Sequence, residues 1–139
     1  MVAISFSVFK DKLLSGEKTQ TIRPYSEKRF NQLKNARVLH IYWKQRTKEC
    51  QLLFLADLVD LFRIRFTEEK KVKKIIENYS SGDIEYLVFS HFLTDNELDD
   101  LVKFDGFNSV DELFDWFYNK YGDSMYEKEF MVIRFKRRS

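Results

Sequence analysis

Short runs of β-branched and apolar residues predict strands near both ends of this chain and through its middle. Such runs are typical of strands that bury one face, and they cover residues 4–6, 19–23, 38–43 and 131–135. A longer run of the same character covers residues 50–64, with apolar side chains on both faces. A strand of that length in a small sheet usually bends or carries a bulge.

Segments with the sequence pattern of helices lie between these predicted strands. A helical turn ends at Ser15-Gly16, where glycine suits a left-handed cap, and the polar residues 26–35 predict a second helix. After Phe66 the apolar residues follow a helical period with lysines between them, at Val72, Ile75, Ile76 and Tyr79. We therefore predict a helix that is broken at Ser80-Ser81-Gly82, followed by an apolar run of either type at residues 86–89.

Two capping boxes mark further helices. Thr94-x-x-Glu97 and Ser109-x-x-Glu112 each place a hydroxyl three residues before a glutamate, and Gly122 is the stop signal of the second helix. Strands at both ends with helices between them predict an α+β domain. We expect a small, mostly antiparallel β-barrel of about five or six strands with helices packed around it.

Length and composition indicate one domain over residues 1–139. A chain of 139 residues that is 44% hydrophobic and 17% aromatic is too apolar for disorder. With a single cysteine, no signal-like start and no long apolar run, we expect a cytoplasmic protein without a membrane span or disulfide. Trp43 and Trp116 are assigned to core packing.

The net charge of +2 conceals an asymmetry. Residues 1–48 hold eleven Lys and Arg against three Asp and Glu, whereas residues 83–129 hold three against thirteen. This distribution predicts one basic and one acidic face, the basic one a candidate for contact with a polyanion. Alternatively, the two stretches pack together and neutralise each other.

The first candidate site follows Gly16. Lys18, Thr19, Thr21 and Arg23 place an ammonium, two hydroxyls and a guanidinium around a tight turn into a strand. Such groups can bind an anion or a polar carbonyl. A strand of this kind is also typical of a solvated sheet edge.

The second candidate site is Asp105-Gly106-Phe107, between the two capped helices. Aromatic neighbours can raise the pKa of Asp105 by excluding water, or offer a surface on which a base stacks. An ordinary turn is the alternative explanation of Asp-Gly. A basic tail at residues 134–138 can touch phosphate or be solvated. His40, His91 and Cys50 lack metal-ligand spacing, so we predict no metal site and no cofactor.

Taken together, these segments resemble the ASCH (activating signal cointegrator homology) family of the PUA-like superfamily. The similarity rests on Gly-x-Lys-Thr-x-Thr-x-Arg from Gly16 and on Asp105-Gly106-Phe107, over roughly residues 3–66 and 95–136. It implies a PUA-like barrel with a cleft that binds RNA or a nucleobase, nucleoside or nucleotide. Residues 68–93 would be a variable helical insertion.

The resemblance implies ligand contacts by Lys18, Thr19, Thr21, Arg23, Asp105 and Phe107. Some family members resemble hydrolases of N4-acylated cytidine, and the match places their catalytic Lys, Thr and acidic residue at Lys18, Thr21 and Asp105. Here aspartate replaces the glutamate of that group, which shortens its reach. Lys18 and Thr21 would face opposite sides of an unbroken strand, so this role requires Lys18 to lie in the turn after Gly16.

Four functions compete at this stage. The leading one is an RNA- or nucleoside-binding module, and the second is an amidohydrolase acting on acylated cytidine. A metal-dependent ribonuclease has thin support from a single acidic residue near the motif. The fourth is an interaction protein whose acidic segment 83–129 docks a basic partner. The sequence makes no prediction about oligomeric state.

Overall fold

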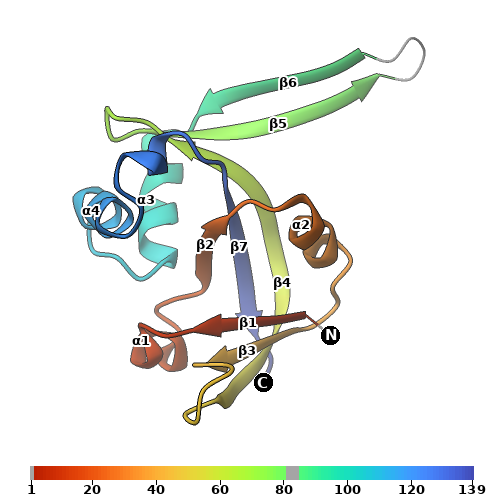
Figure 1. Cartoon of the computed structure of the whole chain (residues 1–139), viewed down its shortest axis with the longest axis vertical. Coiled ribbons are helices and arrows are strands. Elements are labelled where there is room, and N and C mark those ends of the chain that lie inside the picture. Colours follow the sequence, from red (N-terminus) through yellow and green to blue (C-terminus); the bar gives the residue numbers. More distant parts are fainter. Residues whose placement is uncertain (1, 81–84) are drawn as a thin grey trace.

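The computed structural model describes residues 2–80 and 85–139, and its seven strands form one curled, mixed sheet (Figure 1). The strands are β1 (Val2–Phe6), β2 (Gln20–Pro24), β3 (Leu39–Trp43), β4 (Gln51–Phe66), β5 (Val72–Ser80), β6 (Glu85–Phe92) and β7 (Phe130–Arg137). The strand order is β1-β3-β4-β5-β6, with β7 on β4 and β2 on β7. Only β1 and β3 pair in parallel among the described strands.

The 16-residue strand β4 is the centre of this sheet. Its first part pairs with β3, most of it pairs with β7, and its last four residues pair with β5. Register shifts at Ile41/Tyr42 and Leu58/Asp60 curl the sheet. Strands β1, β3, β4, β7 and β2 thus form a half-barrel, which confirms the predicted α+β fold with a small barrel and helices.

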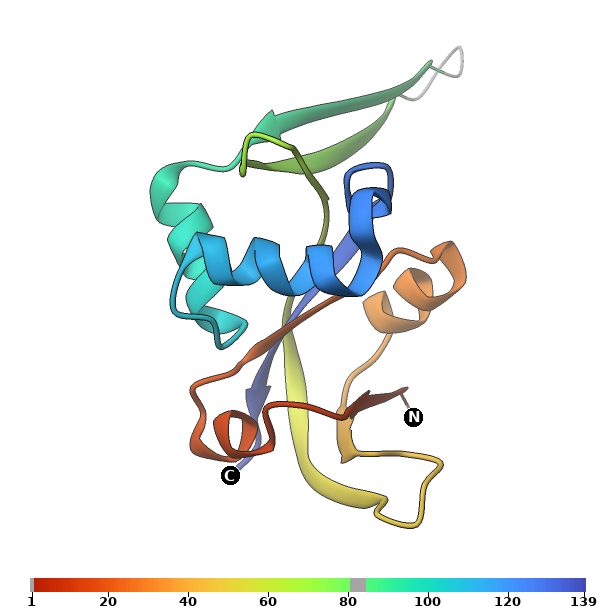
Figure 2. The same ribbon diagram turned by 60° about the vertical axis from the view of Figure 1, so that its left-hand side comes forward.

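The helices pack around the half-barrel (Figure 2). They are α1 (Lys10–Ser15), α2 (Glu27–Lys34), α3 (Asp95–Phe104), α4 (Val110–Tyr121) and the 3-10 helix η1 (Gly122–Tyr126). Both predicted caps are confirmed, since the Thr94 and Ser109 hydroxyls accept hydrogen bonds from the N–H groups of Glu97 and Glu112. Within the described residues, no helix has the length and apolarity needed to cross a membrane.

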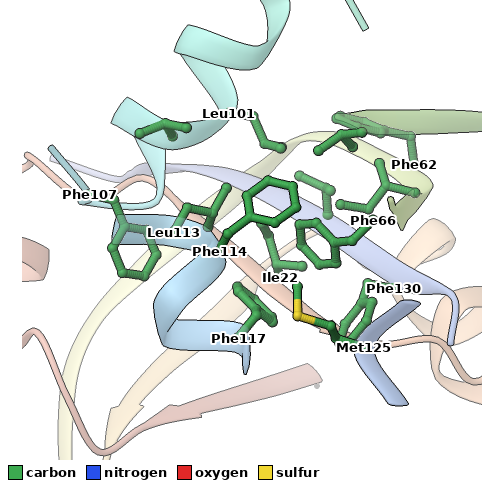
Figure 3. Close-up of a cluster of buried hydrophobic side chains, with 14 residues drawn as sticks. Ile22, Phe62, Phe66, Leu101, Phe107, Leu113, Phe114, Phe117, Met125 and Phe130 are labelled. Carbon is green, nitrogen blue, oxygen red and sulfur yellow. The ribbon is translucent and has the colours of Figure 1, made fainter. Parts of the chain in front are cut away.

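Two hydrophobic clusters fill the domain. One lies between the sheet and helices α3 and α4, where Phe66 packs on Phe114, Phe117 and Phe130 with ring centroids 4.9–5.3 Å apart (Figure 3). The other fills the half-barrel around Leu39 and Ile41. Alternate residues of β7 enter the two clusters, as expected for a strand with helices on one face and the barrel core on the other.

The helical structure predicted within residues 68–93 is wrong, because β5 and β6 form a hairpin that extends from the end of β4 (Figure 1). Val72 pairs with Phe66 and is buried, and Ile75 pairs with Arg63. Val72 and Ile75 are β-branched, and the open edge of β4 supplies partners for their backbone. Tertiary pairing thus overrides a local helical period. The predicted break at Ser81-Gly82 lies outside the described residues.

Candidate functional site

A pocket of about 280 Å³ opens between β1 and the loop that follows it, the turn before β2, β2 itself, the α3–α4 turn and α4. Its lining includes five of the six residues predicted to contact a ligand, namely Lys18, Thr21, Arg23, Asp105 and Phe107. The sixth, Thr19, does not line it. Its backbone N–H donates to Phe104 O at 2.8 Å, and its carbonyl accepts from Phe135 N at 3.0 Å. Thr19 therefore joins the site to α3 and β7 rather than facing a ligand.

Lys18 lies in the turn between α1 and β2, as its proposed role requires. Gly16 ends α1 in the left-handed conformation, with φ of 85°, and β2 begins only at Gln20. The N–H of Lys18 donates to Lys12 O at 3.0 Å, which closes the turn. Because Lys18 lies before the strand, its side chain does not have to point away from that of Thr21, and both line the same pocket.

Lys18 and Asp105 form a buried ion pair, each only 4% exposed. Lys18 Nζ donates to Asp105 Oδ2 at 3.1 Å and to Asp105 O at 2.7 Å. Burial lowers the pKa of Lys18, while the Asp105 charge opposes that shift. Burial also raises the pKa of Asp105, against the effect of Lys18 and Gln20. Both groups are thus moved toward their neutral forms, which suits proton transfer.

Gln20 is a member of the site that sequence reasoning missed. It is fully buried, and its Nε2 donates to Asp105 Oδ1 at 3.0 Å and to Leu101 O at 2.9 Å. Its Oε1 accepts from Arg134 Nε at 2.8 Å. Gln20 therefore orients the Asp105 carboxylate from behind the pocket. The sequence signal that could have identified Gln20 is its amide side chain within a run of β-branched residues.

Arg23 closes the gap between β1 and β2, the two ends of the half-barrel, which do not pair with each other in the described structure. Its Nη2 donates to Ser5 O at 2.6 Å, and its Nε donates to Thr21 Oγ1 at 2.9 Å. The guanidinium also lies 5.0 Å from the centroid of the Phe6 ring. Thr21 keeps its own hydroxyl proton to donate to a ligand.

Aromatic rings from three elements form the apolar wall of the pocket. Phe9 contacts Phe107 edge-on at 5.5 Å, and Phe107 contacts Trp116 at 6.2 Å between ring centroids. Trp116 packs against the hydrophobic core, as predicted, and it also lines the pocket. Phe9 adopts a left-handed φ of 63°, an unusual conformation for a residue with a large side chain.

The pocket combines an aromatic wall with a polar end that holds Lys18, Thr21, Arg23 and Asp105. Ligand sites typically have this composition, in which apolar surface supplies affinity and a few polar groups set orientation. Among the described residues, no three His, Cys, Asp or Glu side chains gather closely enough to hold a metal ion.

The chain was compared with protein-family models, curated proteins and solved structures. None of these three comparisons gives a match to this chain.

Proposed function

We propose that this protein binds a nucleobase in the pocket, presented by a nucleoside, a nucleotide or an RNA residue. The observation that carries the proposal is the convergence of Lys18, Thr21, Arg23 and Asp105 on one cavity beside three aromatic rings. The ASCH resemblance, which implies nucleobase or RNA recognition, supports the same conclusion.

The chemistry of the lining suits a base. Bases have a flat apolar face, and stacking on an aromatic side chain stabilises each base by roughly 1–3 kcal/mol. Phe9, Phe107 and Trp116 supply such rings. The edge of a base carries carbonyl and ring-nitrogen acceptors, which Lys18, Thr21 and Arg23 can satisfy as donors.

The size of the pocket supports a single base rather than a duplex. Its volume of about 280 Å³ lies near the lower end of the range for small-molecule sites, roughly 300–1,000 Å³. Asp105 belongs to the acidic stretch and Lys18 to the basic one, so the site lies where oppositely charged parts of the chain meet. A site of mixed charge favours a polar ligand over a long polyanion.

Trp116 offers a direct measure of binding. The chain has two tryptophans, so Trp43→Phe leaves Trp116, at the pocket wall, as the single tryptophan. We expect saturable fluorescence changes on titration with one or more of the four common ribonucleosides or N4-acetylcytidine. Thr21→Val should weaken binding about tenfold by removing a donor.

Thr19→Val is the matched control, because Thr19 lies two residues away and does not line the pocket. It should bind like the parent. Absence of saturable binding for every nucleoside, or equal weakening by the two valine variants, would overturn the proposal.

A second candidate function is hydrolysis of N4-acylated cytidine. It is favoured by the position of Lys18 in the turn after Gly16 and by burial, which lowers the pKa of its amine. Neutral Lys18 would take the Thr21 hydroxyl proton, and Thr21 Oγ1 would bond to the acyl carbon. The carbon–nitrogen bond then breaks, and protonated Asp105 gives its proton to the leaving amine. Water next releases the acyl group as a carboxylic acid.

Chromatography of N4-acetylcytidine incubated with the protein tests this activity. We expect cytidine and acetate to form, with a loss of at least about a hundredfold in Lys18→Met. Lys120→Met is the control, because Lys120 also lines the pocket but has no role in the proposed steps. If the protein binds N4-acetylcytidine without cleaving it, the hydrolase candidate fails and the binding function stands.

A further inference from the structure

A second groove, of about 750 Å³, adjoins the pocket on the far side of Arg23. We call it the arginine groove, and its lining consists of Val2, Ala3, Ser5, Arg23, Arg29, Gln32, Gln45 and Arg46. Ser5 and Arg23 line both cavities, so the two are neighbours. In Figures 1 and 2, β1 passes between α2 and the β3–β4 loop, the elements that contribute to this groove.

Strand β1 holds two of the three arginines in place. Arg23 donates to Ser5 O, and Arg29, from the first turn of α2, donates to Ala3 O. Carbonyls two residues apart point to the same side of a strand, so both guanidinium groups are anchored along one edge of β1. The opposite edge of β1 pairs with β3. Each guanidinium keeps further N–H groups for a ligand.

The third arginine comes from the β3–β4 loop, which is tied to β1. Lys44 N donates to Phe6 O at 2.8 Å, and Gln45 N donates to Ser5 Oγ at 2.9 Å. Arg46 follows directly and is exposed, with a left-handed φ of 69°. Arg46 therefore extends the same array from a backbone that is hydrogen-bonded to β1.

The arginine groove has a positively charged lining. Its lining holds three arginines and no Asp or Glu, and none of the three makes an ion pair within the described residues. By contrast, Arg63, Arg134 and Arg138 each pair with an acidic side chain. Burial lowers the pKa of Arg23, and the charges of Asp105 and Tyr121 oppose that shift. Arg29 adds to the lowering, as expected for a nearby like charge.

We propose that the arginine groove binds the phosphate of a nucleotide whose base occupies the pocket. This inference rests on the proposed function and deepens it, because it makes the preferred ligand a phosphorylated nucleoside or an RNA residue. Planar guanidinium groups form paired hydrogen bonds with phosphate oxygens, which makes arginine well suited to this ligand. Arg23, shared by both cavities, would contact the junction between base and phosphate.

Isothermal titration calorimetry of the wild-type protein tests this inference. The ligands are the four common ribonucleosides, their 5′-monophosphates, a short homopolymeric RNA and inorganic pyrophosphate. We expect a monophosphate to bind about tenfold or more tightly than its nucleoside, and this advantage to fall as salt is added. Tighter binding of the RNA than of the monophosphate would identify a polynucleotide as the source of the phosphate, and the reverse a free nucleotide.

Arg29→Gln and Arg46→Gln should each remove most of the monophosphate advantage while leaving nucleoside affinity unchanged. Arg37→Gln is the matched control, because it makes the same change of charge at an exposed residue outside both linings. It should keep the advantage.

The outcomes separate the two proposals. Equal affinity for nucleosides and monophosphates, or an Arg37→Gln effect equal to that of Arg46→Gln, overturns the phosphate site but leaves the base pocket standing. Pyrophosphate binding that Arg46→Gln abolishes, without binding of any nucleoside, supports the phosphate site and contradicts the base pocket. Absence of binding by every ligand overturns both.

Discussion

Lys18 Nζ lies 3.1 Å from Asp105 Oδ2, joining two residues 87 positions apart in the chain. The pair links the turn before β2 to the end of α3 and forms the buried end of the candidate pocket. Because both groups are buried away from water, their charge states affect the stability of the fold. This relationship leads to the first two predictions.

Removing Lys18 alone should destabilise the fold. Lys18→Met leaves the Asp105 carboxylate buried without its cation, which should lower the free energy of unfolding by about 3–5 kcal/mol. Lys18→Met combined with Asp105→Leu should recover much of this loss, since no buried charge remains. Urea denaturation of both variants measures the difference. A double variant less stable than the single one would contradict this account.

The Lys18→Met penalty should depend on pH. Without Lys18 the pKa of Asp105 rises further above its unfolded value, because Lys18 lowers it in the native pair. A group whose pKa is raised by folding stabilises the native state at low pH and loses that contribution as pH rises through the native pKa. Lys18→Met should therefore unfold more easily at mildly alkaline than at mildly acidic pH, with wild type as the reference.

The pKa of Lys18 should respond in opposite directions to two neighbours. Asp105→Asn should lower it further, because the Asp105 carboxylate favours the ammonium form. Arg23→Gln should raise it, because the positive charge of Arg23 opposes protonation. NMR titration of labelled lysine side chains measures both changes. If neither variant shifts the pKa of Lys18, burial alone controls this amine.

Two glycines with similar backbones should differ in how they tolerate alanine. Gly16 and Gly106 have φ of 85° and 89°, so alanine at either costs about 1–2 kcal/mol in left-handed strain. A Cβ at Gly16 meets nothing within 4 Å, whereas one at Gly106 lies 3.3 Å from Lys12 Cδ and 3.5 Å from Lys18 Cβ. Gly106→Ala should therefore be the more destabilising and should also weaken nucleoside binding.

Gly16→Ala is the control for the binding measurement and should leave affinity close to wild type. Thermal unfolding and Trp116 fluorescence provide the two readouts. If both variants bind equally well, Gly106 does not set the position of Lys18.

Phe9 should be under conformational strain. Its φ of 63° is favourable for glycine and unfavourable for alanine, so Phe9→Gly should be about 1 kcal/mol more stable than Phe9→Ala. Both variants lack the ring and should bind nucleosides equally weakly. Urea denaturation gives the first comparison and fluorescence titration the second. If alanine proves the more stable of the two, the left-handed conformation of Phe9 carries no strain.

Local signals account for the parts of the fold that could be predicted. The caps at Thr94 and Ser109 depend on hydrogen bonds between residues three apart, and the turn at Gly16 depends on one backbone conformation. Residues 72–80 were predicted wrongly as a helix, because as strand β5 they gain backbone partners from the distant end of β4. Within the candidate site, the local turn after Gly16 made Lys18 predictable. Gln20 was not predictable, because its role depends on hydrogen bonds to α3 and β7.

By itself, the sequence determined where most strands and helices form and which polar groups belong to the turn after Gly16 and the Asp105-Gly106-Phe107 turn. These features depend on neighbouring residues and on the alternation of apolar positions. Only the tertiary structure decided that Phe9 and Trp116 share a wall and that Arg23, Arg29 and Arg46 share a groove. Curling of the sheet brings β1 beside β2 and α2. The arginines therefore meet because strands far apart in the sequence pair with each other, which a local sequence pattern does not reveal.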